Sequence, residues 1–174
     1  YLASGTLLFS LLMYPLGSRV SSQESKGPIG ESPSVWVHPW PSMTQAAVSL
    51  TFDDAYFSHA EIAAPVLESY GFRGTFYLIV DRLFKRGKYL RVSSATFEAW
   101  QAVATKGHEI GSHTLSHVSL DSINAVDLEA ELRASRDDLE QLFSGVRVES
   151  LSYPFSRTNS KVVRDARGLY SNGR

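Results

Sequence analysis

The pattern of apolar and polar residues along this chain changes period several times, from two, as in a strand, to 3.6, as in a helix. The run from Ala46 to Phe52 alternates apolar side chains with Ser49 and Thr51. Alternation in a partly β-branched run predicts a buried strand. Later strands are predicted over 73–80, 108–112 and 150–154, and a fifth begins at Leu169.

Segments with helical spacing fill the intervals between these strands. Residues 56–70 are predicted as a helix with Ile62, Val66 and Leu67 on its inner face, an N-cap at Ser58 and a stop at Gly71. Further helices are predicted over 94–105, with Phe97, Trp100 and Val103 inside, over 124–143, with Leu128, Leu132, Leu139, Leu142 and Phe143 inside, and over 161–167.

The helix over 124–143 also carries a charged face, which is interpreted as a solvated surface. Strands that alternate with helices in this way predict an α/β fold, with a parallel sheet or barrel and the helices outside. The charged residues in question are Glu129, Glu131, Arg133, Arg136, Asp137, Asp138 and Glu140.

The first 43 residues differ in composition from the rest. Residues 1–16 are mostly apolar but fewer than the ~20 residues that span a bilayer as a helix. They resemble the apolar part of a signal peptide, with a membrane anchor or a core helix as alternatives. Residues 17–43 are rich in Ser, Gly and Pro and are predicted as a linker, in which Trp36 and Trp40 form either a sugar-stacking platform or an apolar plug.

Composition narrows the classes of function. The chain has 174 residues, of which 43% are hydrophobic and 20% charged, as expected for one soluble domain with a real core. Its net charge of −1 gives no reason to expect a nucleic-acid partner. The absence of cysteine excludes disulfides and thiolate ligands, so a metal could bind only to histidine and carboxylate side chains.

Such side chains gather at two predicted strand ends. Asp53 and Asp54 follow the first strand, and His113 and His117 follow the third. One carboxylate and two imidazoles can hold a divalent metal while a second carboxylate acts as a base. Taken singly, each pair has a simpler interpretation, because Asp-Asp often begins a loop or caps a helix and two surface histidines can fall four apart by chance.

The segment Thr51-Phe52-Asp53-Asp54 resembles the first motif of polysaccharide deacetylases, carbohydrate esterase family 4 or the nodulation-protein-B homology domain. His113-Thr114-Leu115-Ser116-His117 resembles the second motif of this family. The resemblance covers Ala46 to Arg174. It implies a catalytic domain over 44–174 with a distorted (β/α) barrel of about seven strands, of which the last are not reached here.

The resemblance also implies roles for individual residues. Asp54, His113 and His117 match the ligands of a divalent metal, with zinc expected first and cobalt, nickel or manganese as alternatives. Asp53 matches the catalytic base, although it could instead orient a histidine. The implied reaction is the hydrolysis of N- or O-linked acetyl groups on an extracellular or cell-wall polysaccharide by metal-activated water.

The third motif matches only in part. Tyr153, Pro154 and Phe155 lie where it would fall and are the candidate oxyanion and substrate-binding residues, with the Phe155 backbone N–H as the oxyanion donor. A strand end closed by a turn explains them equally well. Ser152 stands where the family often has an arginine that braces the base, and Ala55 stands where glycine is commoner.

These departures leave other functions open. No histidine follows Ser156 to match the family's late proton donor, so a non-catalytic metal- and carbohydrate-binding relic is the first alternative. A non-haem iron oxygenase is the second. The expected partner is an N-acetylglucosamine polymer or acetylated xylan. The expected location is secreted, periplasmic or at the cell envelope, with membrane attachment through residues 1–16 as an option.

Overall fold

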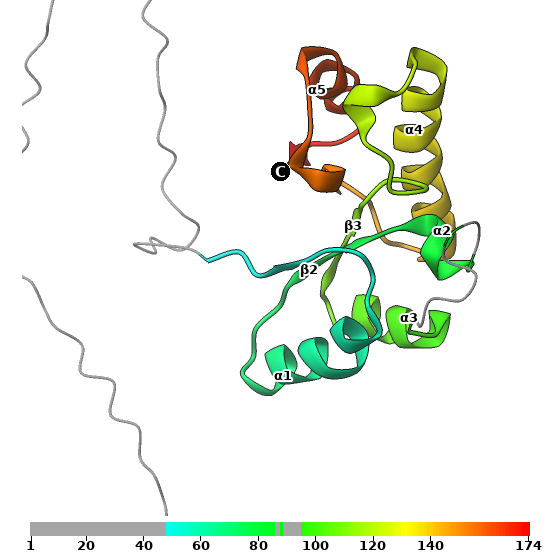
Figure 1. Cartoon of the computed structure of the whole chain (residues 1–174). Coiled ribbons are helices and arrows are strands. Elements are labelled where there is room, and N and C mark those ends of the chain that lie inside the picture. Colours follow the sequence, from blue (N-terminus) through cyan, green and yellow to red (C-terminus); the bar gives the residue numbers. More distant parts are fainter. Residues whose placement is uncertain (1–47, 86–87, 89–94) are drawn as a thin grey trace, which may run out of the picture. The chain divides into compact units, whose positions relative to one another are not determined.

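The computed structural model describes residues 48–85, 88 and 95–174. The predicted segments 1–16 and 17–43 therefore lie outside the described residues, as do Trp36 and Trp40. Five described strands form one parallel sheet in the order of the chain, which confirms the predicted α/β architecture (Figure 1). They are β1 (Thr51–Phe52), β2 (Thr75–Leu78), β3 (Glu109–Ser112), β4 (Ser150–Leu151) and β5 (Asn172–Gly173).

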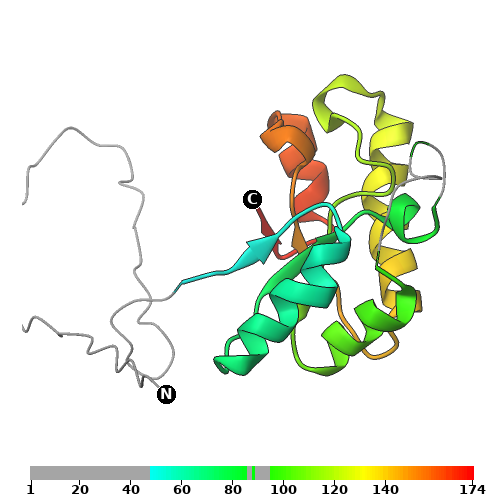
Figure 2. The same ribbon diagram turned by 60° about the horizontal axis from the view of Figure 1, so that its bottom comes forward.

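Helices connect the strands. Because parallel strands in chain order are joined by crossovers of one hand, the connecting helices lie on one face of the sheet. Figures 1 and 2 show α1, α3, α4 and α5 following one another around the strands. The helical segments are η2 (His59–Ala63), α1 (Ala64–Ser69), α2 (Val80–Leu83), α3 (Phe97–Thr105), η4 (Leu120–Ser122), α4 (Ala125–Leu142), η5 (Pro154–Ser156) and α5 (Ser160–Arg167).

The sheet is strongly curved. In a flat sheet, β1 and β5 would lie four strand spacings apart, or roughly 19 Å. Yet Asp53, directly after β1, lies 2.6 Å from Arg174, directly after β5, measured between a carboxylate oxygen and a guanidinium nitrogen. Curvature of this degree is typical of barrels, as the resemblance implied.

The second and third predicted helices have the expected inner faces. Trp100 and Val103 of α3 are buried, and so are Leu128, Leu132 and Leu139 of α4. Side chains at Thr96 and Asn124 accept backbone N–H bonds at the first turns of the two helices. No helix within residues 48–85, 88 and 95–174 has the length and apolar content needed to span a membrane.

The first predicted strand is shorter and more exposed than expected. Only Thr51 and Phe52 pair with β2, and Val48 is 85% exposed. Pairing begins where the N–H of Thr75 donates to the carbonyl of Leu50, so the residues before Leu50 lie beyond the start of the ladder. Alternation of apolar side chains identified the strand correctly, but Val48 is not in the core.

The inner face predicted for the first helix is right for Leu67, which is partly buried and packs against the core, and wrong for the other two residues. Ile62 and Val66 are 60% and 51% exposed, whereas Ala60 and Ala64 are buried. Both sets of residues have helical spacing, so the pattern alone could not decide between two faces. Small alanine side chains allow the helix to lie close to the sheet. Gly71 ends the segment with a φ of +72°, as predicted, whereas the Ser58 side chain makes no capping hydrogen bond.

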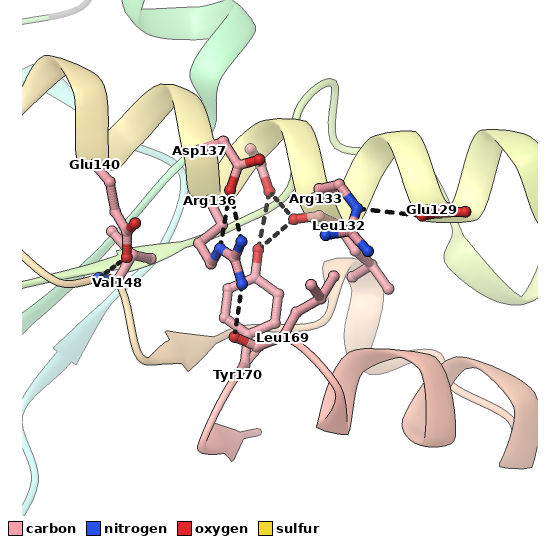
Figure 3. A network of polar contacts seen from close by, with 10 residues as sticks. Glu129, Leu132, Arg133, Arg136, Asp137, Glu140, Val148, Leu169 and Tyr170 are labelled. Atoms are coloured by element: carbon pink, nitrogen blue, oxygen red, sulfur yellow. Dashed lines mark hydrogen bonds and ion pairs between the residues drawn. The ribbon is translucent and has the colours of Figure 1, made fainter.

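The charged face of α4 is mostly solvated, as predicted. Figure 3 shows Arg136 beside Asp137, with its third nitrogen directed to the Leu169 carbonyl. On the same helix, Glu140 accepts the backbone N–H of Val148 at 3.0 Å. Glu131 is the exception, because it is buried.

Candidate metal centre and active site

The candidate residues lie at one edge of the sheet. The carboxyl ends of parallel strands share an edge, which is where side chains that bind ligands gather in α/β folds. The register aligns Ser112 with both Leu78 and Leu151, so the residues that follow these strands start at similar levels. Polar residues follow four of the five strands: Asp53 and Asp54 after β1, His113 after β3, Ser152 after β4 and Arg174 after β5.

Asp54, His113 and His117 converge on one point. One ligand atom from each lies within 4.8 Å of the other two. Oδ1 of Asp54 is 3.4 Å from Nε2 of His113 and 3.3 Å from Nε2 of His117. Ligands about 2.0 Å from a tetrahedral metal lie roughly 3.3 Å from one another.

The oxygen at the centre of this group receives no hydrogen bond from the part of the chain that the structure describes. This oxygen, Oδ1 of Asp54, is buried. A buried carboxylate oxygen without a partner is costly. A divalent cation among the three side chains would remove that cost, so the donor set fits a metal in both chemistry and spacing.

Neighbouring backbone groups orient His113. Its Nδ1 lies 2.7 Å from the Ser152 carbonyl oxygen, which can only accept a hydrogen bond. Nδ1 therefore carries a proton, which leaves Nε2, 3.4 Å from Asp54 Oδ1, as the nitrogen that can bind a metal. The backbone N–H of His113 also donates to the Leu78 carbonyl at 2.9 Å, which ties the residue to β2.

The surroundings of His117 favour its neutral form. Burial lowers the pKa of His117, and the neighbouring His113 lowers this pKa further. The Asp54 carboxylate acts in the opposite direction and raises it. The neutral imidazole is the form that binds metals, so the direction of the shift favours a ligand role. The ring of Phe155 lies 4.6 Å from the His117 ring at an angle of 62° and covers one side of it.

Glu131 of α4 holds the loop between the two histidines. Its carboxylate accepts the backbone N–H groups of Leu115 and Ser116 at 3.0 and 2.9 Å, and also the Ser116 hydroxyl. The interpretation of Glu131 as a solvated residue is therefore wrong. The only feature of the sequence that could have indicated burial of Glu131 was its position beside Leu132, at the margin of the apolar stripe of the helix.

Left-handed backbone angles recur in all three motif segments. Side chains other than glycine rarely adopt positive φ, and such angles gather at functional sites. Ala55 has a φ of 52°, which explains why glycine is commoner at its position. The other residues of the three motifs with positive φ are Asp54, Thr114, His117, Phe155 and Ser156.

Asp53 has different partners from Asp54. Its Oδ2 accepts the Ser152 hydroxyl at 3.2 Å, and its Oδ1 lies 2.6 Å from Nη2 of Arg174. The alternative that Asp53 orients a histidine gains no support, because the Nδ1 of His113 is bonded to a backbone carbonyl. Arg174 was missed in the sequence, where it is only the residue after the last predicted strand.

The third motif is divided between two environments. Phe155 is 60% exposed and lies beside His117, so the structure brings it to the metal ligands. Pro154 is buried. The Tyr153 ring instead lies against β5, where a Cβ added to Gly173 would be 2.8 Å from the Tyr153 hydroxyl.

Known proteins with similar sequences are named as deacetylases. The chain is 28% identical over 123 residues to YxkH of Bacillus subtilis, named as a polysaccharide deacetylase, covering 71% of this chain and 42% of that protein. It is 26% identical over 121 residues to a chitin deacetylase of Arthroderma benhamiae, covering 68% and 31%. The chain thus spans less than half the length of these curated relatives.

A solved structure supports the same fold. The deacetylase PplD of Streptococcus pyogenes, in complex with acetate, superposes with a TM-score of 0.67 at 22% identity, covering 74% of this chain and 54% of that chain. This likeness confirms the distorted (β/α) barrel as the fold class. The family model described as polysaccharide deacetylase matches residues 41–170. The chain therefore belongs to the polysaccharide deacetylase family.

Proposed function

We propose that this chain carries the metal site and the base of a hydrolase that removes acetyl groups from a polysaccharide. The observation that carries the proposal is the convergence of Asp54, His113 and His117 around a buried carboxylate oxygen that has no hydrogen-bond donor among the described residues. The family of the chain supports the same chemistry.

Asp54, His113 and His117 would hold the metal. A bound divalent cation lowers the pKa of water toward ~7 and polarises a carbonyl group. Asp53 accepts the proton of the attacking water, since each of its oxygens keeps a lone pair beyond its contact with Ser152 or Arg174.

The leaving amine or hydroxyl must also gain a proton when its bond to the acetyl carbon breaks. The last histidine of this chain is His117, so the late histidine that the resemblance implies is not among these residues. We expect zinc as the metal, and an N-acetylglucosamine polymer or acetylated xylan as the substrate. Phe155, exposed beside His117, offers an apolar ring to a sugar. We further expect a secreted or cell-envelope protein.

The non-catalytic relic is the second candidate. It is suggested by Ala55, by the missing late histidine and by Ser152, which leaves the base without the family's usual arginine. In the structure, however, Asp53 contacts both Ser152 and the guanidinium of Arg174. The proposed base therefore has an arginine beside it, although this arginine comes from another strand. This contact favours the enzyme over the relic. The iron oxygenase is disfavoured because those enzymes usually have antiparallel barrels, whereas all strand pairs described here are parallel.

The test is acetate release by the natural gene product from a chitin oligomer and from acetylated xylan, with and without a chelator. We expect release that the chelator abolishes and that His113→Ala or His117→Ala abolishes together with metal binding. His108→Gln is the control, because His108 lies 3.4 Å from Glu68 and accepts the Gly74 N–H, away from the metal ligands.

Two outcomes would contradict the proposal. Acetate release that survives loss of the metal would exclude the metal mechanism. A metal bound in proportion to protein, without release from either polymer, would favour the relic.

A further inference from the structure

We propose that Arg174 is a positioning residue for Asp53, which it holds from β5 in an orientation that lets the carboxylate act as a base. This inference rests on the proposed function, because only a base needs such orientation. Arg174 touches Asp53 and is not in the group of metal ligands. It therefore acts on the reaction through Asp53.

The two oxygens of Asp53 are held from two different strands. Arg174, after β5, lies 2.6 Å from Oδ1, and Ser152, after β4, donates its hydroxyl to Oδ2 at 3.2 Å. A carboxylate with one contact can rotate about its Cβ–Cγ bond. A carboxylate held at both oxygens has its plane fixed, and each oxygen keeps a lone pair in that plane for a proton.

Arg174 is itself fixed at its backbone. Its N–H donates to the Leu151 carbonyl at 3.0 Å, and its carbonyl accepts the Tyr153 N–H at 2.9 Å. These bonds continue the ladder between β4 and β5 by one residue. The start of the Arg174 side chain is therefore placed by the sheet.

The far end of the side chain is guided by an aromatic ring. The guanidinium carbon of Arg174 lies 5.1 Å from the centroid of the Tyr77 ring, within the range of a cation–π contact. Tyr77 belongs to β2 and is 6% exposed, so its ring is a fixed surface. A planar guanidinium can rest on this ring while it bonds a carboxylate, which a lysine ammonium cannot do equally well.

The exposure of the pair separates this role from a contribution to stability. The side chains of Arg174 and Asp53 are 47% and 34% exposed. Ion pairs with this much solvent contact add little to folding stability. A large effect of Arg174 on the reaction, together with a small effect on unfolding, would therefore indicate positioning.

The experiment compares Arg174→Ala, Arg174→Lys and the control Arg164→Ala in the natural gene product. We expect Arg174→Ala to lower kcat about 10- to 100-fold, while KM and the zinc dissociation constant change less than about threefold. Arg174→Lys should restore part of the rate, and added guanidinium should restore part of the rate of Arg174→Ala. Arg164 is a matched control because it lies on α5, 72% exposed and 3.9 Å from Asp165.

A second measurement tests whether Arg174 acts through Asp53. In an Asp53→Asn background, Arg174→Ala should have no further effect on the residual rate. A crystal structure of the Arg174→Ala variant, which needs no substrate, should also show the Asp53 carboxylate turned away from the orientation that its contacts with Arg174 and Ser152 give it. Equal rate losses in both backgrounds, or a loss of zinc affinity in proportion to the rate, would overturn the inference.

The structure of the variant separates this inference from the proposed function. If the protein releases no acetate but the Asp53 carboxylate turns in Arg174→Ala, the proposed function fails while the positioning role stands. If the carboxylate keeps its orientation in Arg174→Ala, the inference fails whatever the activity.

Discussion

Asp53 and Asp54 are neighbours in the chain, yet the protein treats their carboxylates in opposite ways. Both oxygens of Asp53 contact side chains of the protein itself, a hydroxyl and a guanidinium. Asp54 Oδ1 is buried between two imidazoles and has no hydrogen-bond donor among the described residues. The difference fits the proposed function, in which Asp53 is the base and Asp54 is a ligand of the cation.

The two carboxylates also depend on different parts of the fold. Asp54 meets His113 and His117, from the loop after β3, which α4 supports through Glu131. Asp53 meets residues after β4 and β5. The proposed metal site and the proposed base can therefore be disturbed separately.

The largest expected effect comes from exchanging each carboxylate for an amide. Asp54→Asn should weaken zinc binding by about 100-fold or more, because it removes a charged ligand. Asp53→Asn should leave zinc affinity within a few-fold and lower kcat by about 10²- to 10⁴-fold, the usual contribution of a general base. Zinc titration and acetate release, measured on both variants, check the contrast.

Equal losses of zinc affinity in the Asp53→Asn and Asp54→Asn variants would contradict the contrast between the two carboxylates, because Asp53 would then also be a ligand. Asp127→Asn is a suitable control for the substitution itself, since Asp127 lies in the first turn of α4 and contacts Asn124 there.

A smaller effect is expected from Glu131→Gln. A glutamine can keep its single oxygen on the N–H groups of Leu115 and Ser116, which share Oε2, but it turns an amide group toward the Ser116 hydroxyl and lacks the charge that strengthens these hydrogen bonds. We expect a loss of about 1–3 kcal/mol in the free energy of unfolding and roughly tenfold weaker zinc binding. Thermal unfolding and zinc titration measure the two effects.

Glu129→Gln is the matched control, since Glu129 lies on the same helix, 66% exposed. If Glu131→Gln lowered stability without changing zinc affinity, the loop between the histidines would not need this support.

The smallest effect is expected from Ala55→Gly. Glycine would relieve the positive φ of 52° at Ala55, a gain of about 1–2 kcal/mol. It would also remove a fully buried methyl group, a loss of about 1 kcal/mol, and add freedom to the unfolded chain. The net change in unfolding free energy should stay below about 1 kcal/mol, with zinc affinity unchanged. A large loss of zinc affinity would show that the alanine itself shapes the metal site.

The sequence predicted most of the fold because strands and helices here alternate with clear periods. It also predicted the meeting of Asp54 with His113 and His117, since carboxyl ends of parallel strands share an edge. Arg174 could not be predicted, because its contact with Asp53 depends on the curvature of the whole sheet.

Two other features could not be predicted from the sequence, each for a local reason. The buried role of Glu131 was hidden because a charged residue beside an apolar stripe usually points to solvent. The first helix offered two apolar faces with helical spacing, and only packing against the sheet selects Ala60 and Ala64 over Ile62 and Val66.

The distance along the chain between the partners has a consequence for the order of folding. Asp53 is 99 residues from Ser152 and 121 residues from Arg174, and contacts of such long range form slowly. The proposed metal ligands His113 and His117 share one short loop, and the groups that hold this loop, Glu131 of α4 and the Ser152 carbonyl after β4, both precede β5 in the chain. A nascent chain can therefore gather the proposed metal ligands before β5 is in place, and the proposed base is held at both oxygens only when the last of these strands has joined the sheet.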